Sequence, residues 1–480
     1  MFARTTTVGL TLLALGAGPA TKMAHWPQFR GPGAAASADG GRLPAEFGPD
    51  KNLVWKTALP PGHSSPCIWG DHIFLTALDE GKLETICIRR TDGRVLWRKA
   101  TPQVEIAEVH PGRGSSAAST PTTDGQRVYV YFGSFGLVCY DFDGNEQWKR
   151  PLDPPNNFFG AATSPVRAGD LLILNCDQDV ASYVLALNPA TGETVWKKPR
   201  DGFPKGYTTP FLWEHDSVQE LIVPGTLRAK AYDLRDGYER WSVDGLARIV
   251  CTSPAAGDGL LFLATWAPGA EAADRIKVDS FDDYIATHDK NNDRKITLDE
   301  VTEDAIQRRF RHFDANKDGV VLEAEWTAMA AVFSKARNAL LAIRPGGQGD
   351  VTKTHVVWEH TRALPYVASP LYYKGRLYTV KDGGIVSAFH AKTGRQLFSG
   401  RLGVQGEYYA SLVAGDDKVY AAAMTGTVVV LAAGDKLEVV ARNDLAETIM
   451  ATPAIVDGTL YIRTARHLYA FARGAGNARR

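Results

Sequence analysis

The sequence predicts an all-β protein, an eight-bladed β-propeller of four-stranded blades that carries a small α-helical insertion. A Ser/Thr-Pro pair recurs roughly every 40 to 55 residues, apart from one longer gap, and this is the repeat length of a propeller blade. An aromatic residue, mostly Trp, also recurs near the end of each unit. The pairs begin at Ser65, Thr120, Ser164, Thr209, Ser253, Ser369 and Thr452, and Ser411-Leu412 is a degenerate eighth copy.

One unit shows how the repeat predicts strands. Residues 171–174 are a short apolar run that predicts a buried strand, and residues 183–187 predict the next one. Asn188 to Gly192 then predicts a turn, because Pro presets φ and Gly tolerates positive φ. Residues 194–197 predict the outer strand. The closing aromatic residues of the units are Trp55, Trp97, Trp148, Trp196, Trp241, Trp358 and Phe398.

The two ends of the repeat array predict a closed ring. The first Trp precedes the first Ser-Pro pair, and the last unit ends near residue 471 without a Trp of its own. Residues 52–59 are therefore expected to supply the outer strand of the blade whose other strands are C-terminal, which removes two exposed sheet edges. Eight blades follow from the count. Seven blades is the alternative if the unit at Ser411 does not form one.

The longer gap predicts an insertion in blade five. Trp241 and Trp358 lie 117 residues apart, and the surplus falls between residues 260–264 and 339–343, the expected second and third strands of that blade. Loop tips tolerate insertions because little backbone hydrogen bonding is disturbed there. The predicted boundaries place the propeller at residues 21–266 and 339–475, the insertion at 267–338 and a disordered tail at 476–480.

The insertion contains two loops of EF-hand type, residues 289–300 and 314–325. Calcium takes oxygen ligands at loop positions 1, 3, 5, 7, 9 and 12, with a bidentate Glu at position 12. A non-Gly residue at positive φ costs roughly 1 kcal/mol, and Arg294 stands where such loops normally have Gly, so we expect the second Ca²⁺ site to be the stronger. The predicted ligands are Asp289, Asn291, Asp293, the carbonyl of Lys295, Thr297 and Glu300 in the first loop, and Asp314, Asn316, Asp318, the carbonyl of Val320 and Glu325 in the second.

The flanking residues favour a paired, structural calcium module. Ile296 and Val321 occupy position 8 of each loop and are expected to pair in a short β-bridge. Outside the cytoplasm calcium is abundant enough to keep such sites filled, so we expect Ca²⁺ to fold the insertion rather than to signal. A regulatory role is the alternative.

The N-terminus predicts an export signal over residues 1–20. Arg4 supplies a positive region, Val8 to Gly18 an apolar stretch, and Gly18-Pro19-Ala20 a cleavage site of small residues. The apolar stretch is shorter than the roughly 20 residues that span a bilayer, and no other segment predicts an integral membrane helix. We expect a periplasmic or secreted protein. The alternative is a cytosolic protein with an apolar tail.

Composition and missing motifs exclude several function classes. With 54 basic and 54 acidic residues, the chain is not a strongly basic nucleic-acid-binding protein. Five Cys do not make a disulfide scaffold, and each falls in or beside a β segment, where a buried apolar role is expected. The sequence contains no Gly-x-Ser-x-Gly, P-loop or His-Glu-x-x-His motif, so no catalytic residue is predicted.

Several polar side chains precede the Ser/Thr-Pro pairs and are candidates for the axial channel. A ring of such groups would bind a polar ligand or a peptide. The alternative is that they cap strand ends in solvent. The candidates are His63 in Gly62-His63-Ser64-Ser65, Arg113, Lys205, Tyr207, Arg248, Tyr366, Glu407, Tyr408 and Glu447.

The Ser-Pro…Thr-Gly-x-x-x-Trp units resemble the pyrroloquinoline-quinone-type (PQQ-type, quinoprotein alcohol dehydrogenase-like) β-propeller family, and residues 26–32 resemble the opening of its secreted members. The resemblance implies a binding scaffold, similar to propellers that assist outer-membrane protein assembly, with a protein, polymer or carbohydrate partner. The alternative that it implies is a PQQ-dependent alcohol or sugar dehydrogenase. In those enzymes two adjacent Cys contact the quinone and Ca²⁺ sits in the funnel, but here no two Cys are adjacent. We expect a monomeric scaffold.

Overall fold

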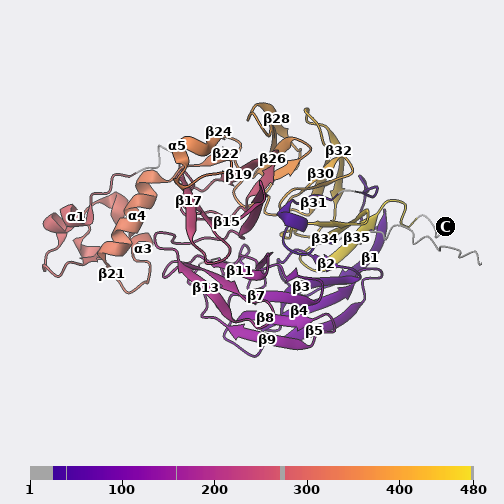
Figure 1. The fold of residues 1–480 in the computed structure, drawn as a ribbon, viewed down its shortest axis with the longest axis horizontal. Coiled ribbons are helices and arrows are strands. Elements are labelled where there is room, and N and C mark those ends of the chain that lie inside the picture. Colours follow the sequence, from indigo (N-terminus) through magenta and orange to yellow (C-terminus); the bar gives the residue numbers. More distant parts are fainter. Residues whose placement is uncertain (1–24, 39, 158, 271–275, 477–480) are drawn as a thin grey trace, which may run out of the picture.

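The computed structural model describes residues 25–38, 40–157, 159–270 and 276–476, and the predicted signal peptide lies outside them. Eight antiparallel four-stranded sheets follow one another around a central axis (Figure 1), and one of them carries a fifth short strand. The prediction of an all-β, eight-bladed propeller is therefore confirmed. Within the described residues, no helix is long and apolar enough to cross a membrane.

The first four blades follow the chain without interruption. Blade one contains β2 (Cys67–Trp69), β3 (His72–Asp79), β4 (Lys82–Arg89) and β5 (Val95–Ala100). Blade two contains β6 (Thr122–Thr123), β7 (Arg127–Phe132), β8 (Gly136–Asp141) and β9 (Glu146–Pro151). Blade three contains β10 (Val166–Ala168), β11 (Leu171–Cys176), β12 (Tyr183–Leu187) and β13 (Thr194–Pro199). Blade four contains β14 (Phe211–His215), β15 (Val218–Pro224), β16 (Arg228–Tyr232) and β17 (Glu239–Asp244).

The last four blades contain the insertion and the closing strand. Blade five contains β18 (Ala255–Gly257), β19 (Leu260–Thr265), β22 (Ala339–Ile343) and β24 (Val356–His360). Blade six contains β25 (Leu371–Tyr373), β26 (Arg376–Lys381), β27 (Ile385–His390) and β28 (Gln396–Arg401). Blade seven contains β29 (Val413–Gly415), β30 (Lys418–Ala422), β31 (Thr427–Ala432) and β32 (Val439–Asp444). Blade eight contains β33 (Ala454–Val456), β34 (Thr459–Arg463), β35 (His467–Ala472) and β1 (Leu53–Ala58).

The ring closes as the sequence predicts. Strand β1 pairs antiparallel with β35, and Thr57 lies opposite Leu468. The second and third strands of each blade are almost wholly buried, whereas the outer strands alternate between exposed and partly buried residues. This burial follows from the position of the outer strand, which has a neighbour on one side only.

The recurring Trp and Gly connect neighbouring blades. Trp55 Nε1 donates to the carbonyl oxygen of Arg90 in the next blade at 2.9 Å. Gly93 has a φ of 76°, and a Cβ added there would lie 2.6 Å from the Trp55 ring, so only Gly fits this turn. The same hydrogen bond recurs from Trp97, Trp148, Trp196 and Trp358. The Gly of each such unit therefore contacts the Trp ring of the preceding blade.

Trp241 is the exception, and the reason lies in blade five. The connection between β22 and β24 contains β23 (Gly349–Asp350) and the short helix α5 (Thr352–His355) instead of a Thr-Gly turn. Strand β23 pairs in parallel with the outer strand β17, and Trp241 Nε1 donates to Glu220 Oε1 at 3.1 Å within its own blade.

The insertion leaves the ring between β19 and β22, as predicted, and lies at its edge in Figure 1. It contains α1 (Phe281–His288), β20 (Ile296–Thr297), a 3-10 turn η3 (Leu298–Glu300), α2 (Asp304–Gln307), α3 (Phe310–Phe313), β21 (Val320–Val321) and α4 (Glu323–Lys335). Its own apolar core includes Tyr284 and Trp326. Val332 of α4 packs against Leu227 of blade four, which fixes the insertion on the propeller.

The chain before the first blade covers the axis of the ring. Trp26 and Ile68 exchange two backbone hydrogen bonds of 2.8 Å, and a 3-10 turn, η1 (Pro32–Ala34), follows. Arg30, which lies between Trp26 and this turn, donates to the carbonyl oxygen of Pro254 in blade five at 2.7 Å and to that of Pro370 in blade six. This N-terminal segment therefore holds blades from both halves of the ring.

Candidate functional site

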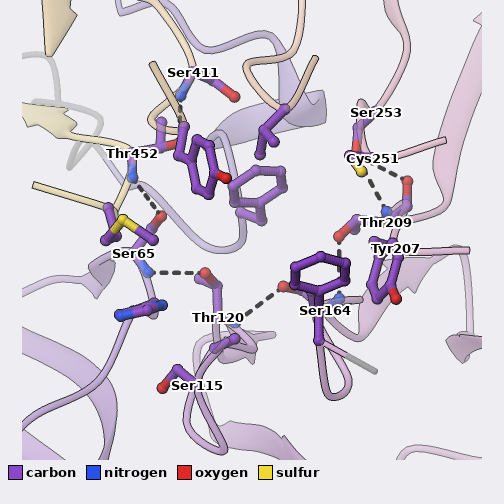
Figure 2. A pocket seen from close by; sticks show the side chains of 18 of the residues that line it. Ser65, Ser115, Thr120, Ser164, Tyr207, Thr209, Cys251, Ser253, Ser411 and Thr452 are labelled. Atoms are coloured by element: carbon purple, nitrogen blue, oxygen red, sulfur yellow. Dashed lines mark hydrogen bonds between the residues drawn. The ribbon is translucent and has the colours of Figure 1, made fainter. Parts of the chain in front are cut away.

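The Ser and Thr residues of the repeat form a closed ring of hydrogen bonds around the axis. In each blade the backbone N–H of the repeat's Ser or Thr donates to the hydroxyl oxygen of the corresponding Ser or Thr in the next blade (Figure 2). The eight bonds measure 2.9 to 3.2 Å. Ser411, which no Pro follows, takes part like the others. The unit at Ser411 is therefore a true blade, and the seven-blade alternative is wrong.

A cavity of about 160 Å³, measured as the space open to the centre of a water molecule, lies inside this ring of hydroxyl groups (Figure 2). Its walls contain five aromatic side chains, those of Phe29, Phe159, Tyr207, Tyr366 and Tyr409. Phe159 and Tyr207 meet edge to face with their ring centres 5.7 Å apart. The cavity has the mixed apolar and polar lining of a small-molecule site.

The structure brings some of the predicted channel residues together and places the others elsewhere. His63, Arg113, Tyr207 and Tyr366 line the cavity. Glu407 forms an ion pair with Arg113, and Lys205 forms one of 3.0 Å with Asp179.

The remaining three candidates do not line the cavity. Tyr408 is buried and donates to the carbonyl oxygen of Val404, and Arg248 donates to that of Pro268. Glu447 accepts hydrogen bonds from Thr464 Oγ1 at 2.6 Å and from His467. These side chains stabilise loops. They lie three to five residues before the Ser or Thr of the repeat and do not occupy the position that faces the axis.

One position in the repeat faces the cavity in every blade, namely the residue two before each Ser or Thr. Alternate residues of an extended segment point the same way, so this position lies on the same side as the hydroxyl group. The spacing is visible in the sequence, and it identifies lining residues that a choice by polarity alone misses. The eight residues are His63, Ala118, Ala162, Tyr207, Cys251, Val367, Tyr409 and Met450.

Two further cations lie just behind the walls of the cavity, in addition to Arg113, which lines it and is paired with Glu407. Arg30 and Arg463 are fully buried, and burial lowers the pKa of each to about 9. Burial and the charge of Arg463 lower the pKa of His63 to about 4, so that the imidazole is neutral at pH 7. No Asp or Glu lines the cavity.

The lining does not fit a quinone held by calcium. Its side chains include no carboxylate and no amide, the groups that would supply oxygen ligands to Ca²⁺. Within the described part of the chain, no three His, Cys, Asp or Glu side chains are grouped to hold a metal ion. All five Cys are free; Cys251 lines the cavity, and the other four are buried.

The two loops of the insertion share one pattern of hydrogen bonds. The carboxylate at position 1 accepts the backbone N–H at position 6, from Arg294 to Asp289 at 2.9 Å and from Gly319 to Asp314 at 3.0 Å. The Glu at position 12 accepts the N–H groups of positions 2 and 9 in both loops. Ile296 pairs with Val321, as expected.

These features define a class, the closed eight-bladed propeller with an axial cavity. The chain belongs to the family described as outer membrane protein assembly factor BamB, whose model matches residues 39–210 and 339–479. The gap in that match contains the insertion. A search of curated proteins found no match.

Solved structures share this fold at low sequence identity. BamB from Moraxella catarrhalis is 13% identical, with a TM-score of 0.54 over 88% of this chain and 99% of that chain. The quinohemoprotein alcohol dehydrogenase ADHIIG from Pseudomonas putida HK5 is 10% identical, with a TM-score of 0.56 over 94% of this chain and 80% of the enzyme. The computationally designed Ika8 protein is 11% identical, with a TM-score of 0.55 over 88% and 99%. These likenesses show the fold alone.

Proposed function

We propose that this chain is exported and acts as a scaffold that binds protein partners during the assembly of outer-membrane proteins. The observation that carries the proposal is the family match, which covers the propeller apart from blade four and the first two strands of blade five and is described as an assembly factor. The closed ring suits this role, because it gives a rigid body on which outer strands and loops are held in fixed positions.

The outer strands are the surface that suits a protein partner best. Strand β17 already accepts a parallel segment, β23, along its edge. An outer strand of this propeller therefore binds extended chain through its backbone, the mode known as β-augmentation. Apolar side chains are exposed on five outer strands at Val54, Val95, Leu96, Val195, Val357 and Val440.

In-cell photo-cross-linking tests this role. A photo-reactive amino acid at Val195, on the outer strand of blade three, is expected to cross-link an outer-membrane protein or a component of its assembly machinery, as identified by mass spectrometry. Leu298, in the insertion, is the matched control, since both side chains are 49% exposed. Equal products from both positions, or products that contain only cytosolic proteins, would contradict the proposal.

We further propose that the two loops of the insertion bind Ca²⁺ through the eleven ligands predicted from the sequence. The shared hydrogen bonds preform both loops around the carboxylates at positions 1 and 12. Among the described residues these carboxylates do not form a group of three around one point, so we expect the ion to bring them together. Ca²⁺ then holds α1, α3 and α4 together as a structural element.

Circular dichroism with and without a chelator tests the structural role. Removing calcium is expected to reduce the helical signal and to leave the β signal of the propeller, because the blades do not depend on the insertion for their hydrogen bonds. Simultaneous loss of both signals would show that calcium supports the whole fold.

The quinone-dependent alternative has a direct assay. The protein is incubated with PQQ and Ca²⁺ and then offered alcohols or sugars with a redox dye. The scaffold proposal predicts no dye reduction above a protein-free control, and steady turnover would overthrow it.

A further inference from the structure

Two buried cations flank the axial cavity without an anionic partner. Arg30 is 0% and Arg463 1% exposed, and neither forms an ion pair among the residues that the structure describes. Arg30 directly follows Phe29, which lines the cavity. Arg463 donates to Ser64 Oγ at 2.6 Å, and Ser64 stands in the chain between the lining residues His63 and Ser65. The Nε of each guanidinium has no hydrogen-bond partner. Because an isolated buried charge is costly, both favour an anion inside the cavity.

The ring of hydroxyl groups adds hydrogen-bond donors. Each ring oxygen already accepts a backbone N–H, so the group that remains for a ligand is its O–H. The Ser253 hydroxyl donates to the carbonyl of Thr209. The hydroxyl groups of the other seven ring residues donate to no acceptor within the described chain. Six of those seven line the cavity: Ser65, Thr120, Ser164, Thr209, Ser411 and Thr452.

The shape and lining of the cavity restrict the anion further. Phe159, Tyr207, Tyr366 and Tyr409 line the cavity, and aromatic side chains pack well against a flat unsaturated body. A volume of about 160 Å³ suits a molecule of one ring. We propose that the axial cavity binds a small aromatic carboxylate without a metal ion, its carboxylate accepting ring hydroxyl groups and its ring lying among the aromatic side chains. This site is independent of the proposed scaffold role.

Calorimetric titration of the full chain with two probes of one shape tests the charge requirement. 4-Hydroxybenzoate carries a carboxylate, and 4-hydroxybenzamide replaces it with a neutral amide. We expect the carboxylate to bind at least tenfold more tightly. Equal affinities, or no binding of the carboxylate at millimolar concentration, would overturn the proposal.

A pair of variants tests the location. Ala162 lines the cavity two residues before Ser164, so A162F fills the space, whereas A190F places the same side chain in the exposed turn after β12, away from the cavity. We expect at least a tenfold loss of 4-hydroxybenzoate affinity in A162F and an unchanged affinity in A190F. Unchanged binding in a folded A162F, as judged by its melting temperature, would place the ligand elsewhere.

A measurement on the unaltered protein keeps the proposal testable if A162F fails to fold. Cys251 lines the cavity and is partly exposed, whereas the other four Cys are buried. Saturating 4-hydroxybenzoate is expected to slow the alkylation of Cys251 severalfold, as followed by mass spectrometry, and the amide at the same concentration is not. An unchanged alkylation rate with the carboxylate bound would contradict the assigned site.

Discussion

The backbone N–H of Thr452 donates a hydrogen bond of 3.0 Å to the hydroxyl oxygen of Ser65, and this bond joins the last blade to the first. It is one link in a ring of eight that uses the same two groups in every blade. The Pro after most of these residues strengthens the arrangement, because it fixes φ and has no N–H of its own to satisfy. The ring therefore closes the fold at the axis, while β1 and β35 close it at the rim.

Loss of one ring hydroxyl should destabilise the whole propeller. In S65A the buried N–H of Thr452 loses its acceptor, and an unsatisfied buried donor costs about 1–3 kcal/mol. S65T is the control, because it keeps the hydroxyl that Thr supplies in other blades. Chemical denaturation measures both free energies of unfolding, and equal values for S65A and the unaltered protein would show that the ring bond is not stabilising.

The contact between Trp55 and Gly93 predicts a larger effect. G93A forces a Cβ to within 2.6 Å of the indole ring and also strains a φ of 76°. Gly81 has a similar φ of 78° with no atom within 4 Å of an added Cβ, so G81A measures the backbone strain alone. We expect G81A to cost roughly 1 kcal/mol and G93A at least about 1 kcal/mol more, from overpacking. Equal losses in a denaturation experiment would contradict the docking of Trp on Gly.

Stability should fall at mildly acidic pH, and His63 should contribute. Its pKa is lowered from 6.5 to about 4 by burial and by Arg463, so the unfolded state binds the proton more readily. This contribution is complete above pH 6.5 and is lost as the pH falls toward 4; it amounts to at most about 3 kcal/mol. His312, with a pKa also lowered to about 4, acts in the same direction. In H63Q the free energy of unfolding should therefore change less between pH 7 and 4 than in the unaltered protein; an equal change would show that His63 does not contribute.

The two proposed calcium sites should differ because of one residue. Arg294 has a φ of 57° at the position where Gly319, with a φ of 84°, stands in the second loop. R294G should relieve roughly 1 kcal/mol of strain and tighten the first site about fivefold. The E325Q substitution disables the second loop, so calorimetry on E325Q measures Ca²⁺ binding at the first site alone. An R294G/E325Q protein that binds Ca²⁺ no more tightly than E325Q would contradict the account.

The sequence predicts the fold further than it predicts the cavity. The repeat marks all eight blades, the insertion point and the closing strand, because each rests on local strand and turn chemistry repeated along the chain. The exception at Trp241 is not predictable from the repeat, since β23 and Glu220 replace the usual partners through contacts made only in the folded protein.

The cavity is predictable only in part, because polarity alone is a poor guide to which side chains face the axis. Glu447 and Lys205 are polar residues near the ring, but each is held by a partner outside the cavity. Cys251 and Met450 look like ordinary core residues, yet they line the cavity because they stand two residues before Ser253 and Thr452. Phe29 comes from outside the repeat, and no periodic pattern places it at the axis.

The most direct test of the scaffold role is the amount of folded outer-membrane protein in cells that lack this chain. Quantitative mass spectrometry of purified outer membranes would compare the source organism, a deletion strain and a deletion strain that expresses the unaltered protein. The account predicts a reduced amount of folded outer-membrane proteins in the deletion strain and full recovery on re-expression. Identical outer-membrane protein levels in all three strains would contradict it.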